Sequence, residues 1–275
     1  MKDLEKVHKN ERRDRTIVTV GDIRVGIDCL IVAGPCAVES DKQIITIAKE
    51  VKKAGANLLR GNIYKPRTSP YSFSGVQAKG LRYLNEVKLQ TGLPIVTEVL
   101  DIRDIEKVIE YCDVIQVGSR NMQNYSLLRE VGKIDKPVIL KRGFMATIHE
   151  WLCSAEYILL EGNKNIILCE RGIRTFETYT RNTLDLSSVA ALKELTHLPV
   201  ISDPSHGTGK RGLILPLCLS SIMAGSDGVM MEVHTDPNMS VSDANQTISL
   251  EKFYDVADKV KKTWEFRQSI SNCLI

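Results

Sequence analysis

The feature that most constrains this chain is a repeated alternation between short apolar runs and longer segments with helical periodicity. The eight apolar runs lie at residues 30–34, 57–60, 94–98, 113–118, 137–142, 165–171, 199–203 and 227–233. They follow one another at intervals of about 20 to 40 residues, which leaves room for a strand and a crossover helix in each unit. A Gly or Pro precedes several runs, as in AGAN, TGLP and THLP, and ends the helix before it. This pattern is typical of βα units around a parallel sheet.

Eight units in a chain of 275 residues favour a closed (β/α)8 TIM barrel, of the α/β class, over an open doubly wound sheet. No linker rich in Pro, Gly or Ser divides the sequence, and no G-x-G-x-x-G follows the first run, which argues against a dinucleotide-binding fold. Residues 16–29 alternate around Gly21 and Asp22, and they predict a short β-hairpin that covers the barrel floor. We therefore expect a flexible charged arm over 1–15 and a single catalytic barrel domain over 16–275.

The composition narrows the class of partner. The chain has 37 Lys and Arg against 34 Asp and Glu, and this balance shows no basic tail or stripe, so nucleic acid is not expected as a partner. No window of about 18 apolar residues is present, and the N-terminus does not resemble a signal peptide, so a membrane is not expected either. The seven cysteines include no C-x-x-C pair and fit reduced, mostly buried thiols in a cytoplasmic protein.

Residues that can carry chemistry follow every one of the eight runs. In a barrel, the carboxyl ends of the strands meet at one mouth, where the active sites of such enzymes lie. These ends carry Cys36, Arg60, Glu98, Arg120, Lys141, Arg142, Glu170, Arg171, Asp203, His206, Glu232 and His234. Charged residues also gather in loops by chance. That explanation is weak for eight ends in eight, because unpaired charge in a confined mouth is costly.

The cations at this mouth predict anionic ligands. Six of them lie at or near the strand ends, namely Arg60, Lys65, Arg67, Arg120, Lys141 and Arg171. These six cations are far more than the neighbouring acidic residues could neutralise in a purely structural network. An arginine fork matches a phosphate or carboxylate with two hydrogen bonds, so we expect several anionic groups to bind at once.

A second set of side chains at the mouth has the donor types of a divalent metal site. The set comprises Cys36, His206, Glu232 and Asp243, and it suits Mn, Fe, Co or Zn with a position left for substrate. Taken alone, Cys36 would be read as a buried core thiol. We expect His234 and Asp203 to orient the ligands, and we place His149 and His197 on surface helices.

Several motifs resemble one enzyme family closely. The segments are GPCAVES at 34–40, RGNIYKPRTSPYSFSG at 60–75, QVGSRNMQN at 116–124, ILKRG at 139–143, ILCERG at 167–172, RNTLDLS at 181–187, SDPSHGTG at 202–209 and MMEVHTDP at 230–237. Together they resemble 3-deoxy-D-arabino-heptulosonate 7-phosphate (DAHP) synthase, of the short type I beta branch, from about residue 16 to about residue 265. Departures from the expected pattern flank the ligands, at Asn62, Ile63, Ser74, Ala244 and Asn245.

The resemblance implies a reaction and a role for each residue. The substrates would be phosphoenolpyruvate and D-erythrose 4-phosphate, with one divalent metal ion as cofactor, in a cytoplasmic homo-oligomer, either a tetramer or a dimer. The catalytic residues would be Lys141, Glu98, His206 and Cys36. Phosphoenolpyruvate would be bound by Arg60, Arg120, Lys141 and Arg171. Erythrose 4-phosphate would be bound by Lys65, Arg67 and Thr68. Lys141 is either a proton donor or an anion contact.

Three rival functions remain at the level of sequence. A 3-deoxy-manno-octulosonate 8-phosphate synthase would share the barrel and phosphoenolpyruvate but use a five-carbon sugar, whereas KPRTSP favours the four-carbon aldose. A Schiff-base aldolase would use Lys141 as its nucleophile. A barrel that senses phosphosugars without turnover is the non-enzymatic alternative, and the intact metal set argues against it.

Overall fold

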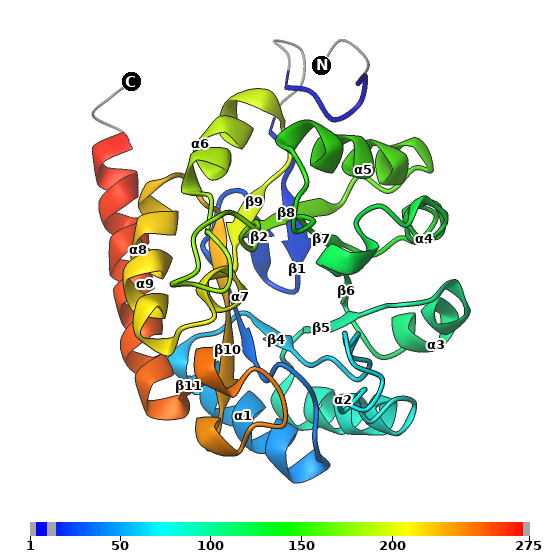
Figure 1. The fold of residues 1–275 in the computed structure, drawn as a ribbon, viewed down its shortest axis with the longest axis vertical. Coiled ribbons are helices and arrows are strands. Elements are labelled where there is room, and N and C mark those ends of the chain that lie inside the picture. The colour runs from blue at the N-terminus through cyan, green and yellow to red at the C-terminus, as the bar shows by residue number, and fades with distance from the viewer. Residues whose placement is uncertain (1–3, 10–14, 272–275) are drawn as a thin grey trace.

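The computed structural model describes residues 4–9 and 15–271, and in it eight parallel strands close into a barrel (Figure 1). The strands are β3 (Leu30–Gly34), β4 (Leu58–Arg60), β5 (Ile95–Glu98), β6 (Val114–Val117), β7 (Val138–Lys141), β8 (Ile166–Glu170), β9 (Val200–Ser202) and β10 (Gly228–His234). β10 pairs with β3 on one side and, at Val229 and Ser202, with β9 on the other, which closes the ring. The predicted TIM barrel is confirmed, and each strand lies within one residue of its predicted run.

Helices surround this barrel (Figure 1). They are α1 (Asp41–Ala54), α2 (Lys79–Thr91), α3 (Ile105–Ile109), α4 (Tyr125–Gly132), α5 (Ile148–Leu160), α6 (Leu186–Leu195), α7 (Pro204–Thr208), α8 (Ile214–Met223) and α9 (Leu250–Ser271), with a short strand β11 (Ile248–Ser249) before the last. Local signals set their limits. The Ser40 hydroxyl caps α1 by accepting from the backbone of Gln43, and Gly55 ends it at φ 93°, where other residues are strained.

The N-terminal hairpin closes the floor of the barrel. Its strands β1 (Val18–Val20) and β2 (Ile23–Val25) pair in antiparallel register. Val18, Val20 and Val25 are buried and pack with the residues of the strands that point into the barrel. Each fully buried valine contributes roughly 1.5 to 3 kcal/mol, so the hairpin is part of the core. The prediction of a covered floor is confirmed.

The prediction of a flexible charged arm over residues 1–15 is wrong for residues 4–9, and residues 1–3 and 10–14 lie outside the described residues. Leu4 and Val7 are buried in the core cluster of α5, and the backbone N–H of Val7 donates to the Glu156 carboxylate at 2.8 Å. His197, expected on a helix surface, is buried too, and its Nδ1 lies 2.6 Å from the Thr16 hydroxyl. Leu4 and Val7 stand among charged residues and follow no helix or strand periodicity, so the sequence does not indicate that they are buried.

The six cysteines in the described residues are free thiols, and Cys36, Cys112, Cys169 and Cys218 are buried. This agrees with the prediction of mostly buried, reduced cysteines. Within residues 4–9 and 15–271, no helix has the length and apolar character to cross a bilayer.

Candidate active site and metal centre

The strand ends open into a cavity of about 240 Å³ at the barrel mouth. Ten of the predicted site residues line it: Arg60, Lys65, Arg67, Thr68, Glu98, Arg120, Lys141, Arg171, His206 and Asp243. The fold therefore brings together side chains that lie far apart in the sequence. Cys36 and Glu232 lie next to this cavity, through contacts with residues that line it.

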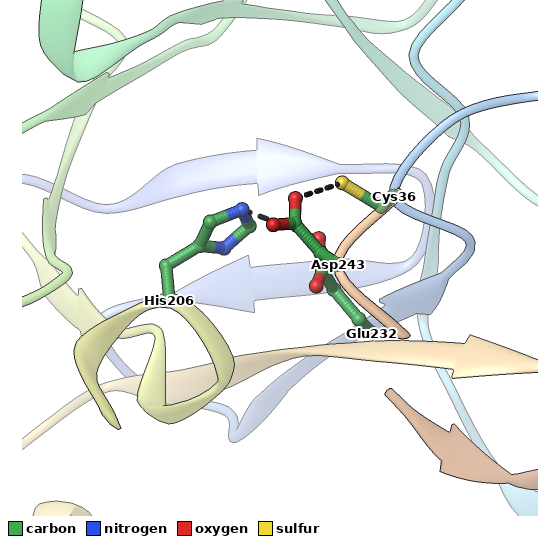
Figure 2. A group of neighbouring side chains, drawn as sticks. All are labelled: Cys36, His206, Glu232 and Asp243. Atoms are coloured by element: carbon green, nitrogen blue, oxygen red, sulfur yellow. Dashed lines mark hydrogen bonds and ion pairs between the residues drawn. The ribbon is translucent and has the colours of Figure 1, made fainter. Parts of the chain in front are cut away.

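The four predicted metal ligands form one cluster (Figure 2). Cys36 follows β3, His206 lies on α7, Glu232 lies in β10, and Asp243 lies in the loop before β11. One potential ligand atom from each lies within 4.8 Å of the others. Donors bound at about 2.0 to 2.3 Å from one ion lie at most about 4.6 Å apart, so a small shift would bring all four onto an ion.

Contacts within the cluster match the donor chemistry of a transition metal. The Cys36 Sγ donates to Asp243 Oδ2 at 2.8 Å, and His206 Nε2 lies 3.2 Å from Glu232 Oε1. Burial raises the pKa of the Cys36 thiol, and the neighbouring Glu232 raises it further. Burial also lowers the pKa of His206 to about 4, so its ring is neutral at neutral pH, which is the form that binds metals.

Lys65 connects this cluster to the cavity. Its ammonium group donates to Cys36 Sγ and lies 3.2 Å from Asp243 Oδ2, while the same residue lines the cavity wall. Burial disfavours the charged amine, but Cys36 and Asp243 outweigh it and raise its pKa. Lys65, predicted to contact the aldose, thus contacts two of the predicted metal ligands.

Asp203 holds His206 in place, as expected for an orienting residue. Its Oδ1 accepts from the backbone N–H of His206 at 3.0 Å, which caps α7, and its Oδ2 lies 2.7 Å from His206 Nδ1. Lys141 Nζ lies 2.6 Å from the same Oδ2. Burial alone would raise the pKa of Asp203, but His206 and Lys141 lower it well below its usual range. His234, the other expected orienting residue, instead lies 3.3 Å from Glu39 Oε1.

Arg60 is a buried cation aimed at the cavity. Its side chain is 1% exposed, and Nη1 lies 3.1 Å from Glu232 Oε1. None of its three guanidinium nitrogens makes a hydrogen bond of good geometry to the described residues. A buried donor without a partner is costly, so an anionic ligand in the cavity would satisfy this group.

Glu98, at the end of β5, is buried and also lines the cavity. Gln116 Nε2 donates to its Oε2 at 3.1 Å, and Asn62 Nδ2 lies 3.5 Å from the same oxygen. Gly118 makes room for this carboxylate, because a Cβ there would lie 2.0 Å from Glu98 Oε1. Of the departures from the family pattern, Asn62 thus supports Glu98, and Ile63 is buried in the core. Of the remaining ones, Ser74 lies in the loop between β4 and α2, and Ala244 and Asn245 lie in a short 3-10 helix, Ala244–Gln246.

Of the cavity-wall residues that the sequence did not assign to the site, Arg181 and Phe144 have side chains that contact predicted site residues. Arg181 lies well beyond the end of β8, and its Nη1 donates to Asp243 Oδ1 at 2.9 Å. Its place in the RNTLDLS motif was the available signal, because a rule based on strand ends does not reach so far along a loop. Phe144 also lines the cavity. Its ring carries neither charge nor a metal-ligating atom, so the pattern of charges and donors at the strand ends does not indicate it.

Comparisons with known proteins agree with this geometry. The family model described as the DAHP synthetase I family matches residues 7–269. A phospho-2-dehydro-3-deoxyheptonate aldolase from Thermotoga maritima is 46% identical over 263 residues, which are 95% of this chain and 78% of the relative. A 2-dehydro-3-deoxyphosphooctonate aldolase from Syntrophotalea carbinolica is 30% identical over 251 residues, which are 85% of this chain and 87% of the relative.

Solved structures give the same result. The crystal structure of the DAHP synthase from Thermotoga maritima has a TM-score of 0.91 with this chain at 46% identity, and the match covers 94% of this chain and 76% of that one. A truncated form of the Thermotoga maritima enzyme has a TM-score of 0.86 at 43% identity and is covered over 94% of its length. The family model, the sequence identity and the shared barrel agree over nearly the whole chain, which therefore belongs to the DAHP synthetase I family.

Proposed function

We propose that the cavity at the barrel mouth condenses phosphoenolpyruvate with D-erythrose 4-phosphate and water, releasing DAHP and inorganic phosphate. Family membership and 46% identity to the Thermotoga maritima enzyme assign the chain DAHP synthase activity, the first step of the shikimate pathway to aromatic amino acids. The observation that supports the proposal is a cavity lined by Lys and Arg side chains. Two of its wall residues, His206 and Asp243, also belong to the group of four side chains that could hold a metal ion.

The anionic groups of the two substrates account for the cations of the cavity. Phosphoenolpyruvate has a carboxylate and a phosphate, and erythrose 4-phosphate has a second phosphate. In our proposal, phosphoenolpyruvate contacts Arg60, Arg120, Lys141 and Arg171. The aldose contacts Lys65, Arg67 and Thr68. Arg120 Nη2 donates to Thr68 Oγ1 at 3.2 Å, which supports adjacent subsites for the two substrates.

One divalent ion, Mn, Fe, Co or Zn, fits the donors of Cys36, His206, Glu232 and Asp243. When bound, this ion supplies Lewis-acid polarisation of the aldehyde oxygen. The cluster residues would hold it beside Lys65, which we assign to the aldose. Asp203 keeps the His206 ring oriented through Nδ1, which leaves Nε2 directed at the cluster.

The remaining residues position the substrates and water. Carbon 3 of phosphoenolpyruvate attacks the aldehyde carbon, water adds at carbon 2, and the phosphate group then leaves. Glu98 orients the water with its carboxylate, which the amides of Gln116 and Asn62 hold in place. Lys141, fixed by Asp203, supplies either a proton or a positive charge. Holding two polyanions at reacting distance itself contributes about 7 kcal/mol or more.

Phosphate release is the experiment that tests this function. The protein, loaded with Mn, is given phosphoenolpyruvate with erythrose 4-phosphate or with arabinose 5-phosphate, and inorganic phosphate is measured. We expect release with the four-carbon sugar and little with the five-carbon one. Preference for arabinose 5-phosphate would move the chain to octulosonate chemistry, and release with neither sugar would favour a sensing barrel without turnover.

The Schiff-base alternative has a separate test. Lys141 Nζ lies 2.6 Å from the carboxylate of the buried Asp203, and an attack by this amine on a carbonyl carbon would have to break that contact. We expect borohydride with both substrates to leave the mass of the protein unchanged. A reduced adduct on Lys141 would contradict the proposed mechanism.

Separate subsites predict opposite effects of two substitutions. Arg67→Ala should raise KM for erythrose 4-phosphate far more than KM for phosphoenolpyruvate, because a charge-assisted hydrogen bond contributes about 1.5 to 3 kcal/mol, or roughly 10- to 150-fold. Arg171→Ala should do the reverse. Steady-state kinetics with each substrate varied in turn measures both values. Equal effects on both substrates in both variants would remove the assignment.

The family resemblance also leads us to propose a homo-oligomer, a tetramer or a dimer, that works in the cytoplasm. Light scattering coupled to gel filtration measures the mass of the assembly in solution. A monomer at all concentrations that support activity would contradict this part of the proposal.

A further inference from the structure

Phe144 lies at the centre of a group of arginines on the cavity wall. It follows β7, is half-buried, and lines the cavity. The guanidinium carbon of Arg171 lies 4.6 Å from the centroid of its ring, that of Arg174 lies 5.1 Å away, and that of Arg120 lies 5.3 Å away. All three distances are within the range of a cation–π interaction, which is about 6 Å.

These arginines come from separate parts of the chain. Arg120 lies in the turn after β6, and Arg171 and Arg174 lie in the loop after β8. Like charges repel one another, and the repulsion is stronger in a partly buried wall than in water. The negative face of an aromatic ring offsets this repulsion without adding an anion that would compete with the substrate.

The two arginines that line the cavity have few other fixed partners in the described part of the chain. Arg171 is 3% exposed, and its Nη1 donates to the Gly172 carbonyl at 3.3 Å. Burial lowers its pKa. Arg120 is exposed, and its Nη2 donates to Thr68. Arg120 and Arg171 thus share one contact, the aromatic ring of Phe144.

The backbone around Phe144 is firmly held. The backbone N–H of Arg174 donates to the Phe144 carbonyl at 2.7 Å, and Arg142 Nε donates to the Ala146 carbonyl at 2.9 Å. These bonds do not involve the Phe144 ring. Changing the side chain should therefore alter the contacts of the arginines while leaving the loop in place.

We propose that Phe144 is a positioning residue that holds Arg120 and Arg171 in the arrangement that binds phosphoenolpyruvate. This inference rests on the proposed function, because it takes those two arginines as phosphoenolpyruvate contacts. The ring orders the guanidinium groups before substrate arrives, so binding does not have to order them. Without the ring, the same ordering occurs during binding and weakens the affinity for phosphoenolpyruvate.

The test compares Phe144→Leu with the wild-type protein by calorimetry with phosphoenolpyruvate and by steady-state kinetics. We expect Kd and KM for phosphoenolpyruvate to rise about tenfold, with a smaller change in KM for erythrose 4-phosphate and kcat within about twofold. Phe144→Tyr keeps a π face and should restore most of the affinity. Phe176→Leu is the matched control, because Phe176 is 96% exposed on the loop after β8 and is not part of the cavity wall.

Fluorinated phenylalanines at position 144 separate the electrostatic role from simple packing. Fluorine withdraws charge from the ring face while the side chain keeps nearly the same shape. We expect log Kd for phosphoenolpyruvate to rise steadily from phenylalanine to monofluoro- and trifluorophenylalanine. An unchanged Kd across this series, or a Phe144→Leu variant that binds as the wild type does, would overturn the inference alone. A wild-type protein that fails to bind phosphoenolpyruvate would overturn the proposed function as well.

Discussion

We expect Cys36→Ala to lose both the bound divalent ion and turnover, by more than about 100-fold in rate, while the barrel stays folded. Cys36 Sγ lies 2.8 Å from Asp243 Oδ2 within the four-donor cluster, so alanine removes one donor of the four. Burial raises the pKa of this thiol, and a metal ion is what would draw the proton from it. Metal content, phosphate release and circular dichroism measure the three expected results.

Chelator treatment of the wild-type protein should have the same effect and be reversible. We expect turnover to disappear and to return to different extents with Mn, Co or Zn. Cys153→Ala in α5 and Cys218→Ala in α8 are the matched controls, and both should keep the bound metal because neither residue is in the cluster. Full activity after verified removal of metal, or of Cys36→Ala with no metal bound, would end the metal hypothesis.

We expect Arg142→Leu to lower the free energy of unfolding by about 3 to 5 kcal/mol, the typical effect of removing one partner of a buried ion pair. Arg142 Nη1 lies 2.9 Å from Glu170 Oε2 and 2.9 Å from Asp185 Oδ2. Glu170 has no exposed surface, so the variant leaves a buried carboxylate without its cation. Urea unfolding followed by circular dichroism measures the change.

The pH dependence of this loss has a definite sign. Burial raises the pKa of Glu170, and Arg142 opposes that rise, so the pKa becomes higher still in the variant. The folded variant then holds a proton at pH values where the unfolded chain has released it, and its stability falls as pH increases above the unfolded value. The deficit should therefore be larger at pH 8 than at pH 5.5.

The control for this prediction is Arg129→Leu. Arg129 is half exposed and pairs with Glu161 at 3.0 Å on the surface, where solvent screens the charges. We expect a stability change several times smaller than that of Arg142→Leu. Equal losses in the two variants, or a loss for Arg142→Leu that does not depend on pH, would contradict the role given to the buried Glu170.

The barrel could be predicted from the sequence because its signals are local. Each strand is a short apolar run, and Gly55 or Pro94 marks the step from helix to strand within a few residues. The same local logic located Arg60 and Glu98 at strand ends. The clustering of the four proposed metal ligands could be predicted for a similar reason, since each of them lies at or beyond the carboxyl end of a strand, and these ends face the same mouth.

What could not be predicted depends on contacts between distant segments. Val7 is buried because Glu156, on α5, accepts the backbone N–H groups around it, and no pattern within residues 1–15 shows this. Arg181 reaches Asp243 from far along a loop. Phe144 gains its role only where three arginines from two loops converge on it. No pattern in the sequence around any of these residues indicates its contacts in the folded protein.

The seam of the barrel is where β10 meets β3, the last strand of the ring beside the first. Cys36 follows β3, Glu232 belongs to β10, and Asp243 lies 207 residues from Cys36 along the chain. An ion held by these side chains would link the first and last strands of the barrel. Closing so long a loop carries an entropic cost, which the closed barrel already includes. A chain whose β10 has not paired with β3 would not bring these donors together, so metal binding would report that the ring has closed.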